Sequence, residues 1–284
     1  SQTSGAKTIM ATGLKSRQIG MDRFVVTPII TLISPIEGYV GTKVRIEGNG
    51  FASSESIRID LNRSMGIGRG EADVMGRLVI EFIVDAQSGD KLSRIGIIGR
   101  ESRRPCYIDT FKILSKIDKI EPLSGTVGIR AQVSGSGYNS GELVRIDFGK
   151  SASINIVSAD QRGVVSIGFT VDVQTGGEKK AVVVSGLSSG KVNRGEFEIM
   201  PSIVRLIPEN GCVGDKIEVS GNGYEANEVI QIDMGDIKSV AVVQSDENGQ
   251  FSSSLIIPIQ IGARDKILKV WGLSSDMGSL RKFE

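Results

Sequence analysis

The sequence predicts an all-β protein built from tandem copies of a small sandwich domain, and three observations lead to this prediction. A block with the pattern Pro, Gly-x-x-Gly, an alternating strand and Gly-x-Gly-aromatic occurs three times, at 35–51, 122–138 and 208–224. Glycine is frequent, at 36 residues, and β-branched residues dominate the apolar set, which favours short strands and tight turns. No window shows helical periodicity.

The repeat period lies near 86 residues. Gly48, Gly135 and Gly221 are 87 and 86 residues apart. Further markers recur at the same spacing: Asp60, Asp147 and Asp233; Gly76, Gly163 and Gly249. This period exceeds the ~20–50 residues of solenoid repeats, so each copy is expected to be a small domain. We predict repeat 1 at residues 28–113, repeat 2 at 114–200 and repeat 3 at 201–284.

The first 27 residues carry markers of the same repeat. Phe24 lies 87 residues before Phe111, and Gly13-Leu14 precedes Phe24 as a second Gly-Leu pair does in repeat 2. We therefore expect residues 1–27 to be the C-terminal strands of a preceding, incomplete repeat. The alternative interpretation is that this terminal hairpin completes a neighbouring molecule by strand addition.

Repeat 2 shows the strand pattern most clearly. Strands are expected at 117–120, 130–134, 143–148, 154–158, 164–171, 180–185 and 195–200. We interpret Ser124-Gly125 as a turn, and Asp160 to Gly163 as a type I turn with a glycine bulge. Seven short strands with turns every ~8–12 residues predict an immunoglobulin-like β-sandwich. Short junctions between repeats restrict rotation, so the predicted arrangement of the tandem sandwiches is an extended rod.

Charge and composition exclude several classes of function. The chain has 34 basic and 33 acidic residues and a net charge of +1, so nucleic acid is not an expected partner. No apolar run approaches the ~18 residues of a membrane span, so no transmembrane segment is predicted within this sequence. The two cysteines, Cys106 and Cys212, occupy non-equivalent repeat positions and are expected to be free thiols.

The repeated block resembles the IPT/TIG family of immunoglobulin-like domains. Repeat 3 carries the pattern most fully, in Ile207-Pro208, Gly211 to Gly214, Gly221 to Tyr224, Asp233 to Gly235 and Asp246 to Phe251. Repeat 1 departs from it at residues 62–64, which replace the Phe-Gly-Lys of repeat 2. The resemblance implies an immunoglobulin-like fold. It also implies the settings of such arrays: surface-layer and adhesion proteins, receptors, accessory modules of carbohydrate enzymes and DNA-binding factors.

Catalytic chemistry has little support in the sequence. The chain contains no histidine, which removes Ser-His-Asp and Cys-His nucleophile systems and imidazole metal ligands. The Gly-x-Gly segments lack the third glycine and the following helix of a dinucleotide site. We therefore expect no enzyme activity, no catalytic residues and no cofactor-binding residues.

Recurring aspartates make calcium the one cofactor candidate. Calcium takes clustered oxygen ligands, and Asp233, Asp236, Asp246 and Glu247 make repeat 3 the best candidate site. The competing interpretation is that the repeated aspartates end strands, or cap turns by accepting local backbone amides.

Two features raise the question of glycans. Exposed aromatic residues bind sugars, and the candidates are Tyr39, Phe51, Tyr138 and Tyr224. The last three share one repeat position, which favours a role in the core. Asn62 begins an Asn-x-Ser sequon on an expected loop, so it is a candidate glycosylation site.

These observations favour a non-enzymatic structural segment of an extracellular or cell-envelope protein. A surface layer, filament or adhesin stalk would act through lateral and end-to-end domain contacts. Its partners would be other copies of itself or other envelope proteins, with glycans as further candidates. The alternative is a ligand- or glycan-binding module array attached to an enzyme or receptor outside these residues.

Overall fold

The computed structural model describes residues 3–102, 105–259 and 266–283, and every regular element in these ranges is a β-strand. Two compact units divide the chain. Unit 1 comprises Ser1–Lys116, Gly135–Glu142 and Ala159–Val164, and unit 2 comprises Ile117–Ser134, Leu143–Ser158 and Val165–Glu284. The repeat boundaries that the sequence predicts do not coincide with these divisions and stay predictions. The described part of the chain contains no helix long and apolar enough to cross a membrane.

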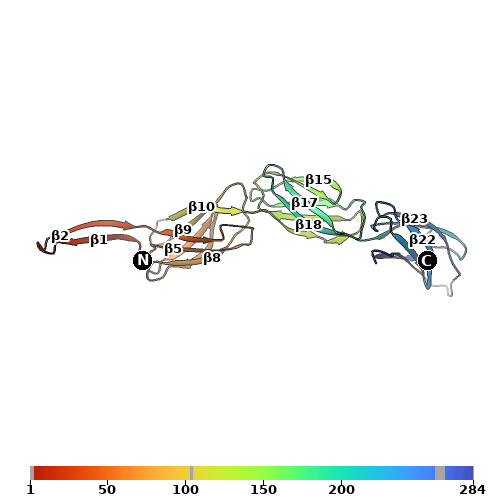
Figure 1. Cartoon of the computed structure of the whole chain (residues 1–284), viewed down its shortest axis with the longest axis horizontal. Helices are drawn as coiled ribbons and strands as arrows, with labels where there is room; N and C mark the ends of the chain where they lie inside the picture. Colours follow the sequence, from red (N-terminus) through yellow and green to blue (C-terminus); the bar gives the residue numbers. More distant parts are fainter. Residues whose placement is uncertain (1–2, 103–104, 260–265, 284) are drawn as a thin grey trace. The chain divides into compact units, whose positions relative to one another are not determined.

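Unit 1 begins with a two-stranded antiparallel ribbon of β1 (Gly5–Thr12) and β2 (Ile19–Val26) (Figure 1). The pairing is regular over all eight residues of each strand, from Gly5 opposite Val26 to Thr12 opposite Ile19. Side chains of the two strands are mostly exposed on both faces.

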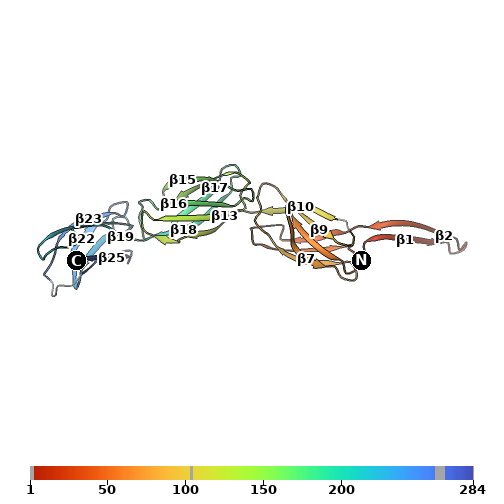
Figure 2. The ribbon, with the colours of Figure 1, turned by 180° about the vertical axis from the view of Figure 1, so that it is seen from behind.

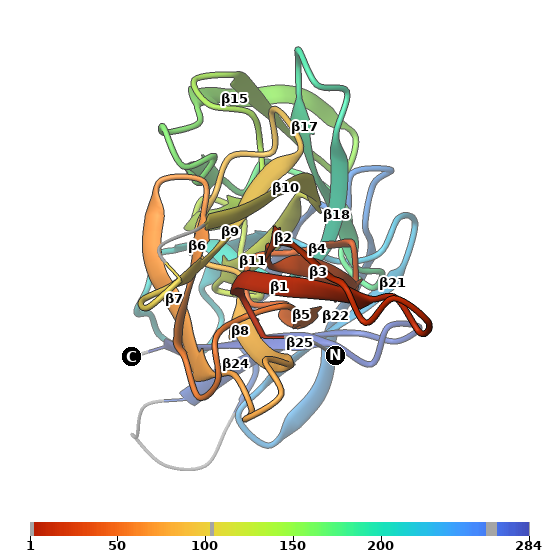
Figure 3. The same ribbon diagram turned by 90° about the vertical axis from the view of Figure 1, so that its left-hand side faces the viewer.

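Two sheets form the first sandwich, in unit 1. Its strands are β3 (Ile29–Ser34), β4 (Glu37–Gly38), β5 (Lys43–Asn49), β6 (Ser56–Leu61), β7 (Ser64–Glu71), β8 (Leu78–Ile83), β9 (Ser93–Gly99) and β10 (Pro105–Ile113). One sheet has the order β3-β5-β8 and the other β4-β10-β9-β6-β7. These strands are labelled in Figure 3. Buried and exposed residues alternate along strands such as β8, because successive side chains point to opposite faces. The inward set, including Ile46, Ile59, Ile97 and Phe111, forms the core.

The strands that follow are β11 (Lys116–Glu121), β12 (Ser124–Gly125), β13 (Arg130–Ser136), β14 (Leu143–Phe148), β15 (Ser151–Ser158), β16 (Val165–Thr170), β17 (Lys180–Gly186), β18 (Val192–Ile199), β19 (Ser202–Ile207), β20 (Lys216–Asn222), β21 (Val229–Met234), β22 (Ile237–Gln244), β23 (Phe251–Ile256), β24 (Lys266–Gly272) and β25 (Gly278–Phe283). They lie in unit 2, apart from Lys116 of β11 and Gly135 and Ser136 of β13, which belong to unit 1. The second sandwich has sheets β11-β13-β16 and β12-β18-β17-β14-β15, several strands of which are labelled in Figure 2. The third has sheets β19-β20-β23 and β22-β21-β24-β25.

This strand order is that of an immunoglobulin-like sandwich, with a three-stranded sheet facing a larger one. The prediction of an all-β chain of tandem immunoglobulin-like sandwiches is confirmed. The extended arrangement of the domains stays a prediction. Both cysteines are free, with Cys106 half-buried and Cys212 exposed.

One local prediction was wrong. Ser124-Gly125 was expected to be a turn, but it forms β12, which pairs in parallel with Glu198 and Ile199 of β18. The chain leaves one sheet at β11 and joins the opposite sheet at β12, so the first strand of the domain is shared between the two layers. A two-residue strand has no alternation to reveal it.

A turn glycine closes the same corner in each repeat. Gly76, Gly163 and Gly249 have φ of 71°, 70° and 72°. A Cβ on Gly249 would lie 2.0 Å from Tyr224 O, and the Tyr224 amide donates to Gly249 O at 3.1 Å. The repeated glycine is therefore required both by its positive φ and by a close backbone approach.

We predict that Gly249→Ala lowers the free energy of unfolding of repeat 3 by about 1–3 kcal/mol more than Gly214→Ala. Gly214 is the matched control, because its φ is also positive, at 94°, while no atom lies within 4 Å of its Cβ position. Urea unfolding followed by the fluorescence of Trp271, the only tryptophan, measures the difference. Equal losses in the two variants would contradict the role of the close approach.

Candidate functional site

The aromatic residue of the Gly-x-Gly-aromatic corner is buried in every repeat. Phe51 and Tyr138 are 0% exposed, and Tyr224 is 1% exposed. The Tyr224 hydroxyl lies 3.1 Å from Ser279 Oγ. Burial raises the pKa of Tyr224 to about 12, although the bond to Ser279 opposes the shift. These rings are enclosed by the core and offer no stacking surface to a sugar, whereas Tyr39 is exposed.

The backbone carbonyl of each of these three aromatic residues also accepts a hydrogen bond from a backbone amide earlier in the chain. In unit 1, Ser4 N donates to Phe51 O and Gly89 N donates to Tyr138 O, both at 2.9 Å. In unit 2, Gly176 N donates to Tyr224 O at 2.8 Å. We name these three bonds the corner junctions. They occur at equivalent places in the repeat pattern and join backbone to backbone.

The corner junctions are closely packed. In unit 1, Asp90 Oδ1 accepts the Ser140 amide at 2.6 Å beside the Gly89 bond. In unit 2, a Cβ on Gly176 would lie 2.0 Å from Gly223 O, so only glycine fits there without displacing backbone. The contact therefore depends on main-chain shape at both ends.

A buried glutamate, which sequence reasoning missed, stands behind each corner. Glu55, Glu142 and Glu228 are 0%, 6% and 3% exposed. They are spaced by 87 and 86 residues, so the repeat period itself could have revealed them. Each carboxylate accepts an amide three residues back, from Ala52 at 2.8 Å in repeat 1 and from Asn139 at 2.6 Å in repeat 2.

In repeats 1 and 3 the glutamate also binds the turn between the last two strands. Glu228 Oε1 accepts the backbone amides of Ser274 at 3.1 Å and Ser275 at 2.7 Å. Glu55 Oε1 accepts the amide of Ser102. A Cβ on Gly272 would lie 2.3 Å from Glu228 Oε1, so the repeated glycine ahead of this turn makes room for the carboxylate. We name Glu55, Glu142 and Glu228 the corner glutamates.

Hydrogen bonding governs the ionisation of Glu228. Burial alone would raise its pKa, but bonds from Ser275, from the Glu225 amide and from Ser274 outweigh burial and lower the pKa below the ordinary 4.5. The carboxylate is therefore held ionised at neutral pH and serves as a structural acceptor.

The aspartates of the sequence pattern cap local backbone. Asp73, Asp160 and Asp246 each accept two amides of their own turn, two and four residues further on, at 2.8–2.9 Å. The strand aspartates Asp60, Asp147 and Asp233 each accept an amide six residues later, at 2.7–2.8 Å. These contacts give every repeated aspartate a structural role.

The structure does not gather the four calcium candidates into one site. Across the described ranges, no three Asp, Glu, His or Cys side chains form a group that could hold a metal ion. Asp233 and Asp246 are engaged by backbone amides, and Asp236 and Glu247 are exposed. Calcium at these residues stays a prediction, and an ion there would compete with the amide donors.

Asn62 lies in the tight connection between β6 and β7, with φ of 51°. Its Oδ1 accepts the Arg94 amide at 2.9 Å, and its Nδ2 donates to Ser93 Oγ at 3.0 Å and to Gln87 Oε1 at 3.3 Å. A glycan on Nδ2 would replace one of the two N–H donors. Glycosylation at Asn62 stays a prediction.

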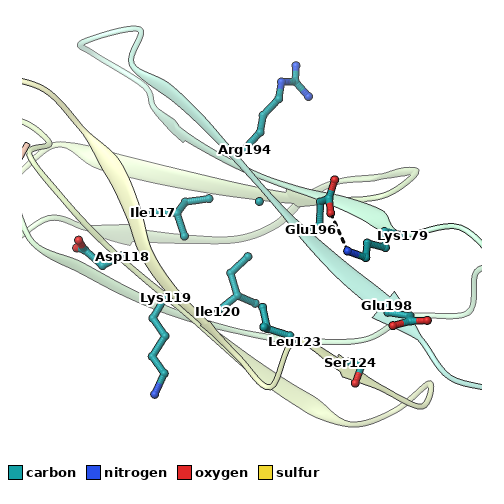
Figure 4. Close-up of a pocket in the computed structure, with 11 residues that line it drawn as sticks. Ile117, Asp118, Lys119, Ile120, Leu123, Ser124, Lys179, Arg194, Glu196 and Glu198 are labelled. Carbon is teal, nitrogen blue, oxygen red and sulfur yellow. Dashed lines mark ion pairs between the residues drawn. The ribbon is translucent and has the colours of Figure 1, made fainter.

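A groove of about 760 Å³ follows the seam of the second sandwich, between β11 and β18 (Figure 4). Among the described strands, β11 has only one neighbour, and β18 is bordered on this side only by the two-residue β12. Ile117, Ile120 and Leu123 line the groove. A Cβ on Gly195 would lie 2.5 Å from Ile120 Cδ1, so this glycine lets the seam close partway.

Charged side chains border this seam groove without forming a reaction centre. Lys179 Nζ lies 3.2 Å from Glu196 Oε2, and Figure 4 shows Lys119 and Arg194 pointing away from the apolar floor. Open strand edges beside apolar side chains are features that extended peptides bind by strand addition. The geometry is suited to contact with a polypeptide.

Comparisons with family models and with curated proteins each found no match. Among solved structures, a protein crystallised with a xylogluco-oligosaccharide is 14% identical with a TM-score of 0.33, and the match covers 90% of this chain but only 60% of that protein. A four-domain ICAM-5 ectodomain fragment is 12% identical, with a TM-score of 0.32 and coverage of 99% and 82%. A Ca²⁺-stabilised ice-binding adhesin from an Antarctic bacterium is 10% identical, with a TM-score of 0.23 and coverage of 99% and 80%. Likenesses at these scores carry no weight for function.

We predict that Glu228→Gln destabilises repeat 3 by about 1–3 kcal/mol at pH 7, because the amide group turns a donor toward backbone donors. The folded-state pKa is lowered, so the stability that Glu228 contributes is present above 4.5 and is lost as pH falls through the lower folded value. Wild-type stability should therefore fall more steeply than that of the variant as the pH drops from 5 to 3.

Trp271 fluorescence during urea unfolding measures both effects. Glu247→Gln is the matched control, because Glu247 is exposed. Parallel pH profiles for wild type and Glu228→Gln would contradict the assignment.

Proposed function

We propose that this chain is a non-enzymatic structural segment of an extracellular or cell-envelope protein, in which tandem immunoglobulin-like sandwiches act through end-to-end and lateral contacts. The observation that carries the proposal is the corner junction, which recurs three times as a backbone bond onto Phe51, Tyr138 and Tyr224. A contact made by main chain at equivalent places is the device that a repetitive array requires.

The structural roles of the residues that recur in each repeat support the same function. The glycines, aspartates, glutamates and aromatic residues that recur at the repeat period are occupied in turns, caps and cores. We propose on the same motifs that repeats 1, 2 and 3 are IPT/TIG-type domains with the predicted boundaries 28–113, 114–200 and 201–284. Recurrent positions that maintain shape are typical of a scaffold.

Lateral contacts have a candidate surface in the seam groove. Its strand edges and its apolar residues Ile117 and Leu123 suit a polypeptide partner such as another copy or another envelope protein. The near balance of charges permits close packing of like chains, since no strong net repulsion opposes it.

We predict that the purified chain forms filaments or lattices visible by negative-stain electron microscopy as its concentration rises. Gly176→Ala should disorder them, because its Cβ would meet Gly223 O at the corner junction of unit 2. Gly190→Ala is the control, since no atom lies within 4 Å of its Cβ position and alanine there adds only the strain of a φ of 68°. A parallel sample with a calcium chelator tests whether Asp233, Asp246 and their neighbours hold an ion.

Isolated particles at every concentration would contradict the assembly proposal. Assemblies that persist in the chelator would show that assembly does not need calcium. Assemblies that are lost only in the chelator would show that it does.

A second candidate function, glycan binding, is favoured by the outer face of repeat 3. Trp271 is 40% exposed, and its Nε1 donates to Asp276 Oδ1 at 3.1 Å. The ring lies against the backbone of Gly278, where a Cβ would come within 2.2 Å of Cε3. Gln231 stands opposite Trp271, whereas the equivalent places in repeats 1 and 2 hold Arg58 and Arg145. A fixed, half-exposed indole beside an amide is suited to stacking on a neutral sugar.

If the chain binds neutral glycans, we predict that titration with soluble cello-oligosaccharide or mannan changes the fluorescence emission of Trp271 and that the change saturates. Trp271→Phe should weaken binding about tenfold or more by calorimetry, because a smaller ring without the Asp276 bond stacks less well. Tyr39→Phe is the control for a non-specific aromatic effect. Unchanged Trp271 emission with a panel of neutral glycans would contradict glycan binding, and the structural function would be the one that stands.

A further inference from the structure

The β1–β2 ribbon reproduces the pairing of the last two strands of each sandwich. Phe24 lies opposite Lys7. The equivalent phenylalanines pair in the same way: Phe111 with Ser93, Phe197 with Lys180 and Phe283 with Lys266. The ribbon thus shares its register with β17–β18 and β24–β25 throughout, and with β9–β10 at the phenylalanine, next to which β10 carries a bulge between Asp109 and Phe111.

Burial separates the ribbon from its three counterparts. Phe111, Phe197 and Phe283 are 0%, 0% and 3% exposed, whereas Phe24 is 42% exposed. Ile9 lies 86 residues before Ile95, and their exposures are 57% and 0%. The ribbon therefore carries core residues of a sandwich without the layer that covers them.

The register identifies the uncovered face. Residues opposite one another share a face, so Phe24, Ile9, Ala11 and Val26 lie together on one side, which we name the inner face. Lys7, opposite Phe24, and Asp22, opposite Ile9, lie on the same face. Met10, Met21, Ile19 and Val25 lie on the other side, the outer face. The inner face matches core positions of the sandwiches, since Phe24 and Val26 correspond to Phe197 and Ile199, both 0% exposed.

The connection ahead of the ribbon is also native-like. Ser4 N donates to Phe51 O, as Gly89 N does to Tyr138 O just ahead of β9. The backbone entering β1 thus follows the path by which the chain enters β9. Isolated two-stranded ribbons are only marginally stable in water, so a covering layer is physically required.

We propose that the inner face of the ribbon is a docking surface for the strands that precede the last two in an immunoglobulin-like repeat of this same type, entering from the N-terminal side of β1. The three sandwiches show what covers the equivalent face: the three-stranded sheet of the same domain, as in β3-β5-β8 against β9 and β10. The surface is independent of the proposed assembly, so either can fail alone.

The test is a hybrid chain in which a second copy of residues 28–89 replaces residues 1–3, giving a fourth repeat of the usual length. Hydrogen exchange of the β1 and β2 amides is compared with the parent chain. We expect exchange to slow by about 100-fold or more in the hybrid, because the ribbon becomes part of a cooperative domain. The amides of the other sandwiches serve as the internal control for folding.

Matched variants separate the two faces. In the hybrid, Phe24→Ser should return the ribbon to the parental exchange rate, while Met21→Ser on the outer face should leave it protected. Neither substitution should alter the other sandwiches in the parent chain.

Three outcomes would overturn the proposal. The ribbon could exchange equally fast in hybrid and parent, or the two serine variants could lose protection alike. Thirdly, the parent chain could sediment as a dimer with a protected ribbon, which would make a second copy the occupant.

Discussion

A buried carboxylate that accepts backbone amides is the interaction on which each sandwich depends at one end. Glu228 ties its own loop to the turn at Ser274 and Ser275, two segments that are far apart in sequence. A desolvated charge is unfavourable unless it is hydrogen-bonded, and here the donors are main-chain groups that also need partners. Loop, turn and carboxylate are therefore satisfied together, and the repeated Gly272 position provides the space.

The corner glutamate and the corner aromatic residue lie together at the same end of each domain. The carbonyl of the corner aromatic faces outward to accept the preceding segment, while its ring faces the core. Main-chain recognition of this kind tolerates change in surface side chains, since only glycine positions and backbone course are required. This is consistent with the proposal that the array acts through its shape.

Sequence reasoning predicted what has a local cause and missed what is made by distant segments. The turn at Asp160 to Gly163 follows from residue types within four positions, and the structure has Gly163 N donating to Asp160 O at 3.0 Å. Glu142 resembles any loop glutamate, because its partners come from elsewhere in the fold. The seam groove was equally invisible, since it arises where β11 and β12 divide between two sheets. The repeat period was the one signal that could have exposed the corner glutamates.

The capped turn of repeat 3 also bears on how the protein ages. Asn248-Gly249 is a pair prone to deamidation, which requires the glycine nitrogen to attack the asparagine side chain. Here the Gly249 nitrogen donates to Asp246 O at 3.1 Å, and the Asn248 nitrogen donates to Asp246 Oδ1. Because the Gly249 nitrogen is engaged in the turn that Asp246 caps, it is not placed to attack the Asn248 side chain. The cap therefore also protects this pair against deamidation.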